Sequence, residues 1–189
     1  LKEKYQNAKF SILGSFYPEN PTAISEETMA AWQKEGVVEY LGVTEDVKSV
    51  IDDQDCIVLP SYREGLSRVL LEAASMAKPI VTTNVPGCKE VVEDGVTGFL
   101  CKERDAASLA AKMEQVLMLK DEARVAMGVK AREKIIREFD EKLVVSLYSR
   151  VVGQLFRKKS ARDLGLLDTA KSYLHAYRGW LTGASVSRG

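Results

Sequence analysis

Several patterns that mark common functional classes are missing from this sequence. It contains neither a Walker phosphate-binding motif nor a G-x-G-x-x-G fingerprint, which argues against an ATPase and against a dinucleotide-dependent dehydrogenase. Its single histidine, His175, lies near the carboxyl end, so hydrolytic Ser-His or Cys-His pairs within the chain are poorly supported. No group of Cys or His residues has metal-ligand spacing, and we therefore expect no metal site.

Net charge, cysteine pairs and long apolar runs are scarce as well. The 27 Lys and Arg residues balance 27 Asp and Glu residues, so the chain lacks the electrostatic footprint of a general nucleic-acid binder. Its 3 cysteines, Cys56, Cys88 and Cys101, form no C-x-x-C pair, which predicts reduced core residues and a cytoplasmic setting. No apolar stretch of about 18 residues and no signal-peptide pattern occurs, so no membrane-spanning segment is predicted.

What the sequence does contain is an alternation of short β-like runs with helical ones, the order typical of a parallel sheet covered on both faces. Its 189 residues suffice for one domain with an appendage. We expect the domain over residues 1–158 and a helical tail over residues 159–189. Ser25, followed by two acidic residues, is predicted to cap a helix that Gly36 ends. Turn residues after the strands should gather the following loops along one rim of the sheet.

The individual elements follow from the same patterns of apolar periodicity and turn residues. Strands are predicted over residues 9–13, 37–41, 56–59, 79–83 and 98–101. Helices are predicted over residues 25–35, 45–51, 66–77, 89–93 and 105–119, with a longer helical region over 121–158.

The most informative segment runs from Glu64 to Glu72 and places two carboxylates around the start of a predicted helix. The run before it, residues 56–60, is short, apolar and closed by proline, which predicts a fully buried parallel strand. Ligands bind at the carboxyl ends of such strands, where a helix N-terminus offers unpaired N–H groups to an anion. This segment is therefore the predicted binding site.

The helix after Glu64 should turn one apolar face to the sheet and leave Glu72 on the other side. The predicted apolar face consists of Leu66, Val69, Leu70, Ala73, Ala74 and Ala77. Glu72 is then free to meet a ligand. The alternative is an ordinary surface ion pair with Arg68, which would contribute only ~0.2 to 0.5 kcal/mol.

An ordered series of motifs surrounds the two glutamates, which by themselves form an E-x7-E pattern. The series comprises Asn20-Pro21, Trp32, Glu39-Tyr40-Leu41-Gly42, Asp46-Val47, residues 55–60, Ser61-Tyr62-Arg63-Glu64-Gly65, Leu70-Leu71-Glu72-Ala73, Lys78-Pro79-Ile80-Val81, Pro86-Gly87-Cys88-Lys89-Glu90 and Asp94-Gly95-Val96-Thr97-Gly98-Phe99. It resembles the C-terminal domain of the retaining, GT-B-fold glycosyltransferases of family 4. Its upstream part is similar to a bacterial branch that builds cell-surface glycans.

The resemblance implies a fold and an activity. The fold is α/β, a Rossmann-like doubly wound parallel sheet that forms the C-terminal half of a GT-B fold, with a helical C-terminal extension. The activity is transfer of a hexose or N-acetylhexosamine from a nucleotide-sugar, UDP-linked in our expectation, to a glycan or lipid-linked acceptor with retention of configuration. Such an enzyme would work in the cytoplasm, at the inner face of the membrane if its acceptor is lipid-linked.

The resemblance also implies roles for residues of the motif. Glu64 would be the catalytic carboxylate that meets hydroxyls of the transferred sugar, and Glu72 would bind the ribose. The amides of Gly65, Leu66 and Ser67 would meet sugar and phosphate. These residue types suit the task, because a carboxylate accepts two hydroxyl hydrogen bonds and glycine allows close approach of the backbone.

Three further residues are expected near the donor. Arg68 would assist the diphosphate, unless it forms the surface ion pair with Glu72. Gly42 and Val43 resemble the family loop near the nucleotide base, with a plain turn glycine as the alternative. Glu90 is expected to be structural rather than reactive.

Neither a cofactor nor a metal ion is implied by the resemblance. Helix N-termini and basic side chains would then balance the leaving diphosphate. The family's first strand, its two diphosphate-binding basic residues and its N-terminal acceptor domain should precede Leu1. We therefore expect the chain alone to bind nucleotide-sugar weakly and to be inactive.

Apolar residues recur at helical spacing in the tail, after a basic cluster. The apolar residues are Leu164, Leu167, Ala170, Leu174, Tyr177 and Leu181, and the basic ones are Arg157, Lys158, Lys159 and Arg162. A helix that packs on the partner domain is favoured over one that rests on an anionic membrane.

Two other functions remain open from the sequence. One is a sugar-nucleotide epimerase of GT-B plan, although its acid and base residues are not recognisable here. The other is a non-catalytic nucleotide-binding subunit whose acceptor half lies on a separate chain.

Overall fold

The computed structural model describes residues 1–20 and 23–158. The chain divides into two compact units, Leu1–Phe139 and Asp140–Gly189. The first unit carries the strands and most of the helices, and the second carries helix α6 (Glu141–Lys158). The predicted helical tail, residues 159–189, lies outside the described residues, so the expected boundary after Lys158 stays a prediction.

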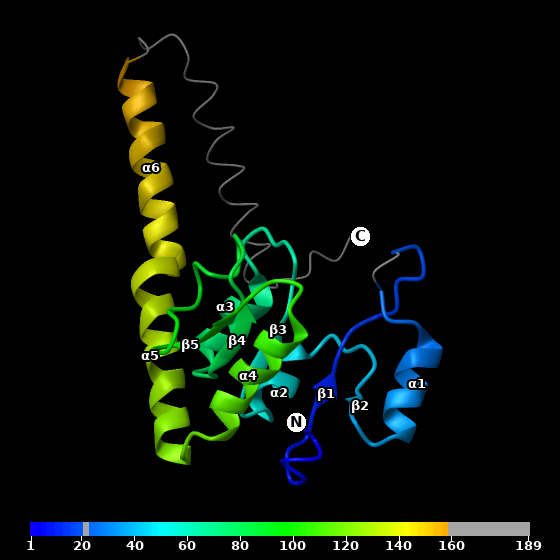
Figure 1. The fold of residues 1–189 in the computed structure, drawn as a ribbon. Helices are drawn as coiled ribbons and strands as arrows, with labels where there is room; N and C mark the ends of the chain where they lie inside the picture. The colour runs from blue at the N-terminus through cyan, green and yellow to red at the C-terminus, as the bar shows by residue number, and fades with distance from the viewer. Residues whose placement is uncertain (21–22, 159–189) are drawn as a thin grey trace. The chain divides into compact units, whose positions relative to one another are not determined.

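All five predicted strands form, and they pair in parallel as predicted (Figure 1). The strands are β1 (Ser11–Ile12), β2 (Glu39–Tyr40), β3 (Ile57–Leu59), β4 (Ile80–Thr83) and β5 (Gly98–Cys101). The helices of the first unit are α1 (Glu26–Lys34), α2 (Val47–Asp52), α3 (Arg68–Ser75), α4 (Ala106–Leu117) and α5 (Asp121–Phe139).

The strands form two sheets, β1-β2 and β3-β4-β5. Strand β4 lies in the middle of the larger sheet, with Val81 opposite Val58 of β3 and Phe99 of β5, and all four of its residues are buried. The prediction that residues 56–60 form a fully buried strand is wrong. Strand β3 is only half-buried, because it is an edge strand of this sheet.

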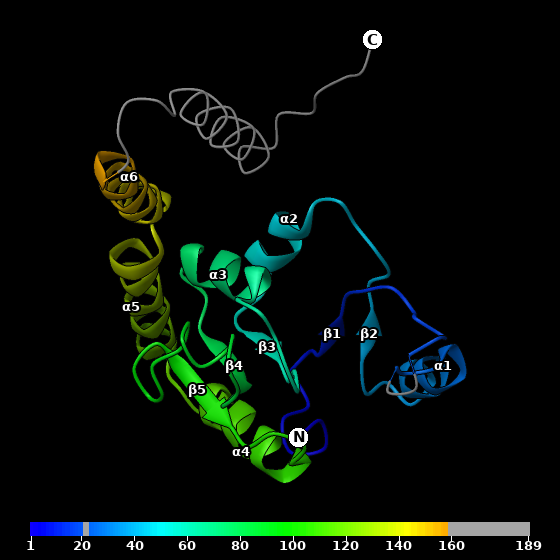
Figure 2. The ribbon, with the colours of Figure 1, turned by 90° about the horizontal axis from the view of Figure 1, so that it is seen from above.

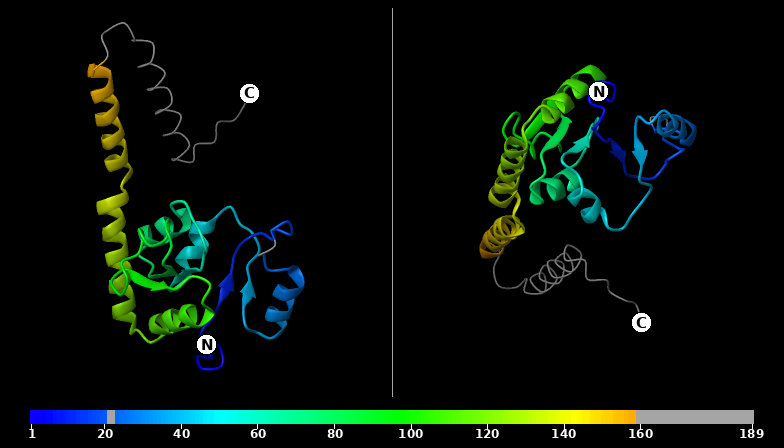
Figure 3. Two further views of the ribbon diagram at one scale, coloured as in Figure 1. Left: turned by 45° about the horizontal axis from the view of Figure 1, so that its top comes forward. Right: turned by 90° about the horizontal axis from the view of Figure 1, so that it is seen from below.

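Helices cover both faces of the β3-β4-β5 sheet, as the alternating pattern predicted. Figure 2 shows α2 and α3 on one face and α4 on the other, and Figure 3 shows the same layers from two further directions. The core follows this division. Ile80 packs with Leu70 of α3, whereas Val81, the next residue of β4, packs with Val116 of α4.

Three helix predictions differ from the structure. Residues 89–91 form a turn and residues 92–93 no regular structure instead of a helix, since the Glu90 carboxylate accepts the Gly87 N–H and closes a local turn. The helical region over 121–158 is interrupted at Asp140, whose side chain accepts the Lys142 N–H and so begins a new helix. Leu66 lies outside α3 and is 49% exposed, so it does not belong to the apolar face.

The helix signals around α1 are confirmed. The Ser25 side chain accepts the N–H of Thr28 at 3.2 Å, which is an N-cap hydrogen bond. Gly36 follows the helix with φ +68°, a conformation that glycine adopts without strain. None of the helices in the described part of the chain is long and apolar enough to cross a bilayer.

Helix α5 approaches the backbone that leads from α3 to β4 at a single glycine. A Cβ added at Gly128 would lie 1.8 Å from the carbonyl oxygen of Ala77. We expect Gly128→Ala to lower the free energy of unfolding by about 1 to 3 kcal/mol, although alanine favours a helix by ~1 kcal/mol. Urea unfolding of the 189-residue chain measures this. The exposed neighbour Val129 is the control, since Val129→Ala should change stability by less than about 0.5 kcal/mol.

Candidate functional site

A pocket opens at the carboxyl ends of the three strands of the larger sheet. Its volume is about 860 Å³. The lining residues are Tyr62, Arg63 and Glu64 after β3, Asn84, Val85 and Pro86 after β4, and Asp94, Leu100, Cys101, Lys102 and Glu103 around the end of β5. The expectation that the loops after these strands share one rim is therefore confirmed.

Glu64 is held in this pocket by a chain of hydrogen bonds that begins in the sheet. The buried Thr83 of β4 donates its hydroxyl to the carbonyl oxygen of Ser61. The Ser61 hydroxyl in turn donates to Oε1 of Glu64 at 2.7 Å. Because Thr83 is fixed by its strand, the bonds fix the loop that carries the carboxylate.

The start of α3 lies directly after Glu64. Gly65 and Leu66 are exposed, and Ser67, the N-cap residue, is buried. The Ser67 amide donates to the carbonyl oxygen of Gly87 at 3.2 Å, so this predicted ligand donor already has a partner inside the protein. The Ser67 side chain makes no capping hydrogen bond to the helix.

The two charged positions of α3 are arranged as the apolar periodicity predicted. Arg68, the first residue of the helix, is exposed, and Glu72 on the next turn is half-buried. Leu70 and Ala73, on the opposite side, are fully buried. Of the predicted site residues, which all lie in the described part of the chain, only Glu64 lines the pocket.

Gly42 and Val43 follow the other sheet. The carbonyl oxygen of Gly42 accepts the N–H of Gly14 at 2.9 Å, so the loops after β1 and β2 are joined by a hydrogen bond. Gly42 has φ +73°, and the Val43 side chain after it is 69% exposed. The glycine is thus required by its turn, whether or not a ligand approaches it.

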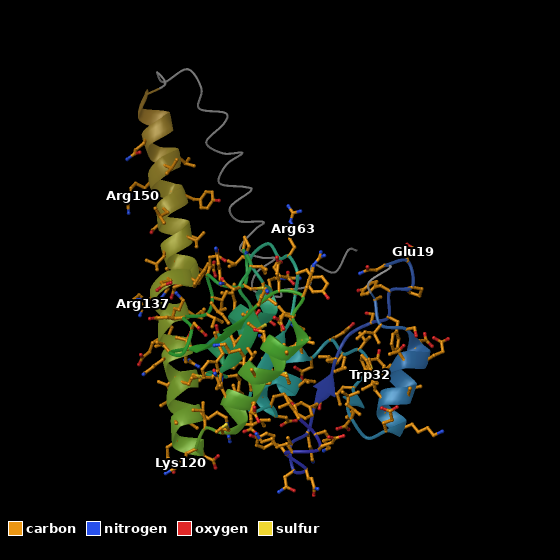
Figure 4. All side chains as sticks on the ribbon, in the orientation of Figure 1. Glu19, Trp32, Arg63, Lys120, Arg137 and Arg150 are labelled. Atoms are coloured by element: carbon orange, nitrogen blue, oxygen red, sulfur yellow. The ribbon has the colours of Figure 1, made fainter. Side chains whose placement is uncertain are left out.

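Several lining residues were not among the predicted site residues. Tyr62 and Arg63 precede Glu64 directly, and Lys102 and Glu103 follow the last strand. Arg104, with φ +54°, lies over the Tyr62 ring at 5.1 Å and so connects the loop after β5 to the loop after β3. The Arg63 side chain extends outward from its loop (Figure 4). Their position immediately after predicted strands was the signal that could have identified them.

The charges of the pocket are mixed and partly paired. Asp94 accepts the Leu100 N–H at 2.8 Å and lies 3.5 Å from the Lys112 ammonium. Glu64 and Glu103 supply further carboxylates, and Arg63 and Lys102 supply cations. Donors and acceptors therefore surround one cavity, which suits a ligand rich in hydroxyl groups. Among the described residues, no group of three or more His, Cys, Asp or Glu side chains is placed to hold a metal ion.

The cysteines are free thiols of the interior, as predicted. Cys88 and Cys101 are buried and Cys56 is half-buried. Burial raises the pKa of the Cys56 thiol to about 12 and also raises the pKa of Cys101, which borders the pocket. These thiols are therefore protonated near neutral pH and are poor nucleophiles.

Comparisons with known proteins agree on one family. The family model for glycosyl transferases group 1 matches residues 1–118. A curated relative from Campylobacter jejuni, N,N'-diacetylbacillosaminyl-diphospho-undecaprenol alpha-1,3-N-acetylgalactosaminyltransferase, is 32% identical over 157 residues. The match covers 80% of this chain but only 39% of that enzyme, so the chain spans less than half of the relative's length.

Solved structures show the same fold. Anabaena HepE, in complex with UDP, superposes with a TM-score of 0.65 at 23% identity and covers 79% of this chain and 41% of that chain. The C-terminal domain of a group 1 glycosyl transferase family protein from Francisella tularensis has a TM-score of 0.65 at 16% identity, with 74% of each chain covered. The fold is thus the C-terminal, Rossmann-like half of a GT-B fold, as expected.

The bond from Thr83 to Ser61 generates a testable prediction. Thr83→Val keeps the side-chain shape but leaves the Ser61 carbonyl without its donor, which should cost about 1 to 2 kcal/mol of stability and loosen the loop before Glu64. Hydrogen exchange of the amides of residues 61–65 should accelerate. Thr82→Val is the matched control, because the Thr82 hydroxyl donates to Leu59 within strand β3. Equal acceleration in both variants would contradict the prediction.

Proposed function

The chain belongs to the group 1 glycosyl transferases, and we propose that it is the donor-binding half of an enzyme that transfers a hexose or N-acetylhexosamine from a nucleotide-sugar. The nucleotide in this proposal is UDP, and the acceptor is a glycan or a lipid-linked saccharide of a bacterial surface polymer. The acceptor would be bound by an N-terminal half, as in a complete GT-B fold.

One observation carries the proposal. A carboxylate fixed by a hydrogen bond, Glu64, borders a polar pocket at the carboxyl ends of three parallel strands, directly before the N-terminus of α3. A single carboxylate can accept hydrogen bonds from two sugar hydroxyls, and helix N-termini bind phosphate. A nucleotide-sugar has both groups in one molecule, joined through its diphosphate.

The motif residues then bind different parts of the donor. Glu64 binds hydroxyls of the transferred sugar, and the amides of the exposed residues Gly65 and Leu66 meet the sugar and the phosphate. The Ser67 amide contributes to the frame instead, since it bonds to Gly87. Glu72, half-buried on α3, binds the ribose hydroxyls, and Arg68 assists the diphosphate. Gly42 and Val43 lie near the base.

We further propose that the reaction retains configuration at the anomeric carbon. The bond from that carbon to the diphosphate oxygen breaks, and the acceptor oxygen bonds to the same face of an oxocarbenium-like centre. The acceptor proton passes to the departing diphosphate. In this scheme Glu64 orients the sugar and stabilises developing positive charge without attacking the carbon.

The names of the two comparison proteins support the substrate class. The Campylobacter relative is named for transfer of N-acetylgalactosamine to a diphospho-undecaprenol-linked sugar, and Anabaena HepE binds UDP. The three free thiols support a cytoplasmic location, because disulfides are rare there. A lipid-linked acceptor would bring the enzyme to the inner face of the membrane.

The two glutamates should affect different steps. In the full-length enzyme, Glu64→Gln should lower the rate of sugar transfer by about 100-fold while UDP affinity changes little, because the lost charge acts in the transition state. Glu72→Ala should weaken UDP binding by about 10-fold through loss of charged hydrogen bonds. Calorimetry with UDP and a radiolabelled transfer assay separate the two effects.

An exposed glutamate outside the pocket serves as the control. Glu122→Gln, an exposed change in the first turn of α5, should leave both quantities unaltered. If Glu64→Gln and Glu72→Ala reduced binding and transfer by the same factor, the division of roles would be wrong.

The proposed enzyme needs no metal ion. The amides at the start of α3 and the nearby basic side chains balance the diphosphate in its place. Transfer by the full-length protein should therefore persist in excess EDTA, measured with the same radiolabelled assay. Loss of transfer in EDTA, restored by Mg²⁺ or Mn²⁺, would overturn this part of the proposal.

A further inference from the structure

We propose that Gly87 and Glu90, in the turn after β4, are positioning residues that hold the loop of Glu64 in its working place. The inference rests on the proposed function of Glu64 and adds two residues that do not touch the ligand in that scheme. It rests on the contacts between the turn after β4 and the loop after β3.

Gly87 lies against the backbone of the Glu64 loop. A Cβ at position 87 would be 1.6 Å from the carbonyl oxygen of Gly65 and 2.6 Å from that of Glu64. Both atoms belong to the main chain, so no side-chain rotation relieves the clash. Gly87 also has φ +86°, which disfavours any other residue. The Glu64 loop can therefore keep its position only while residue 87 has no side chain.

The same glycine also holds the start of α3. Its carbonyl oxygen accepts the Ser67 amide at 3.2 Å. One residue of the turn thus contacts the loop at Gly65 and the helix at Ser67. The Leu66 amide, one of those proposed to meet the donor, lies between these two contacts along the chain.

Glu90 fixes the conformation of Gly87. Its Oε2 accepts the Gly87 N–H at 2.7 Å, a contact in keeping with the structural role expected for Glu90. The amides of Cys88 and Lys89 donate to the carbonyl oxygen of Val85, and the Cys88 and Val85 side chains are buried in the core. The turn is therefore anchored in the interior, and its contacts with the Glu64 loop hold that loop in place.

Together with Thr83, the turn contacts the loop at both ends. Thr83 donates to Ser61 at the beginning of the loop, and Gly87 contacts Gly65 at its end. Glu64 lies between these points and is bonded to Ser61. A displacement at Gly87 must therefore move the carboxylate, and small displacements of a catalytic group reduce rates strongly.

The first test replaces Gly87 in the full-length protein. Gly87→Ala should reduce the rate of transfer by about 100-fold and UDP affinity by at most about 10-fold, because the carboxylate is displaced more than the ribose site. Gly36→Ala is the matched control: Gly36 has φ +68° but open space around its Cβ position, so the backbone strain is similar and the clash is absent. The control should transfer sugar within about threefold of the wild type.

The second test separates a positioning role of Glu90 from a chemical one. A glutamine can still accept the Gly87 N–H through its side-chain oxygen, so Glu90→Gln should keep transfer within about threefold of the wild type. Glu90→Ala removes the acceptor and should lower transfer by about 10-fold or more. If glutamine proved as harmful as alanine, the charge of Glu90 would matter and the positioning role would be wrong.

A third measurement does not depend on activity. In the 189-residue chain, NMR resonances of the Gly65 and Ser67 amides should shift in Gly87→Ala and in Glu90→Ala, but not in Gly36→Ala. Amides that stay in place overturn the positioning role, even if transfer falls. Absence of transfer in the wild-type full-length protein would instead overturn the proposed function and leave the NMR result to decide this inference. If Gly87→Ala fails to fold, Glu90→Ala provides the same readout.

Discussion

The parallel pairing of β4 with β3 on one side and β5 on the other is the constraint on which the site depends. All four residues of β4 are buried, and successive side chains pack on opposite layers of helices. Because the pairing fixes where each strand ends, it places three loops around one cavity. Thr83 at the end of β4 and Gly87 in its turn then contact the loop of Glu64 directly.

Much of this arrangement could be predicted from local sequence patterns. The strands were predicted from short apolar runs closed by turn residues, and the α1 boundaries from Ser25 and Gly36, since each signal acts within a few residues. The position of Glu64 at a strand end follows from the order of a strand and a helix alone. For the same reason, the buried and exposed sides of α3 agree with its helical spacing from Leu70 onward.

The remaining features depend on residues distant in sequence, and local patterns do not contain them. Ser67 was expected to offer its amide to a ligand, but Gly87, twenty positions on, accepts that N–H. The predicted helix over 89–93 does not form, because the Glu90 carboxylate accepts a hydrogen bond from a main-chain N–H and stabilises a turn. Leu66 continued the apolar spacing, yet the chain is not helical there, so it faces solvent.

The frame of the pocket and its lining are made by different atoms. Main-chain groups and the buried Thr83 hold the loops, whereas Tyr62, Arg63, Lys102 and Glu103 present side chains that no strand pairing requires. Substitutions at Arg63, Lys102 and Glu103 can accumulate with little cost to folding. Descendants of one ancestral scaffold can thereby change the chemistry of this cavity through a few codon changes, while the buried strand beneath them stays the same.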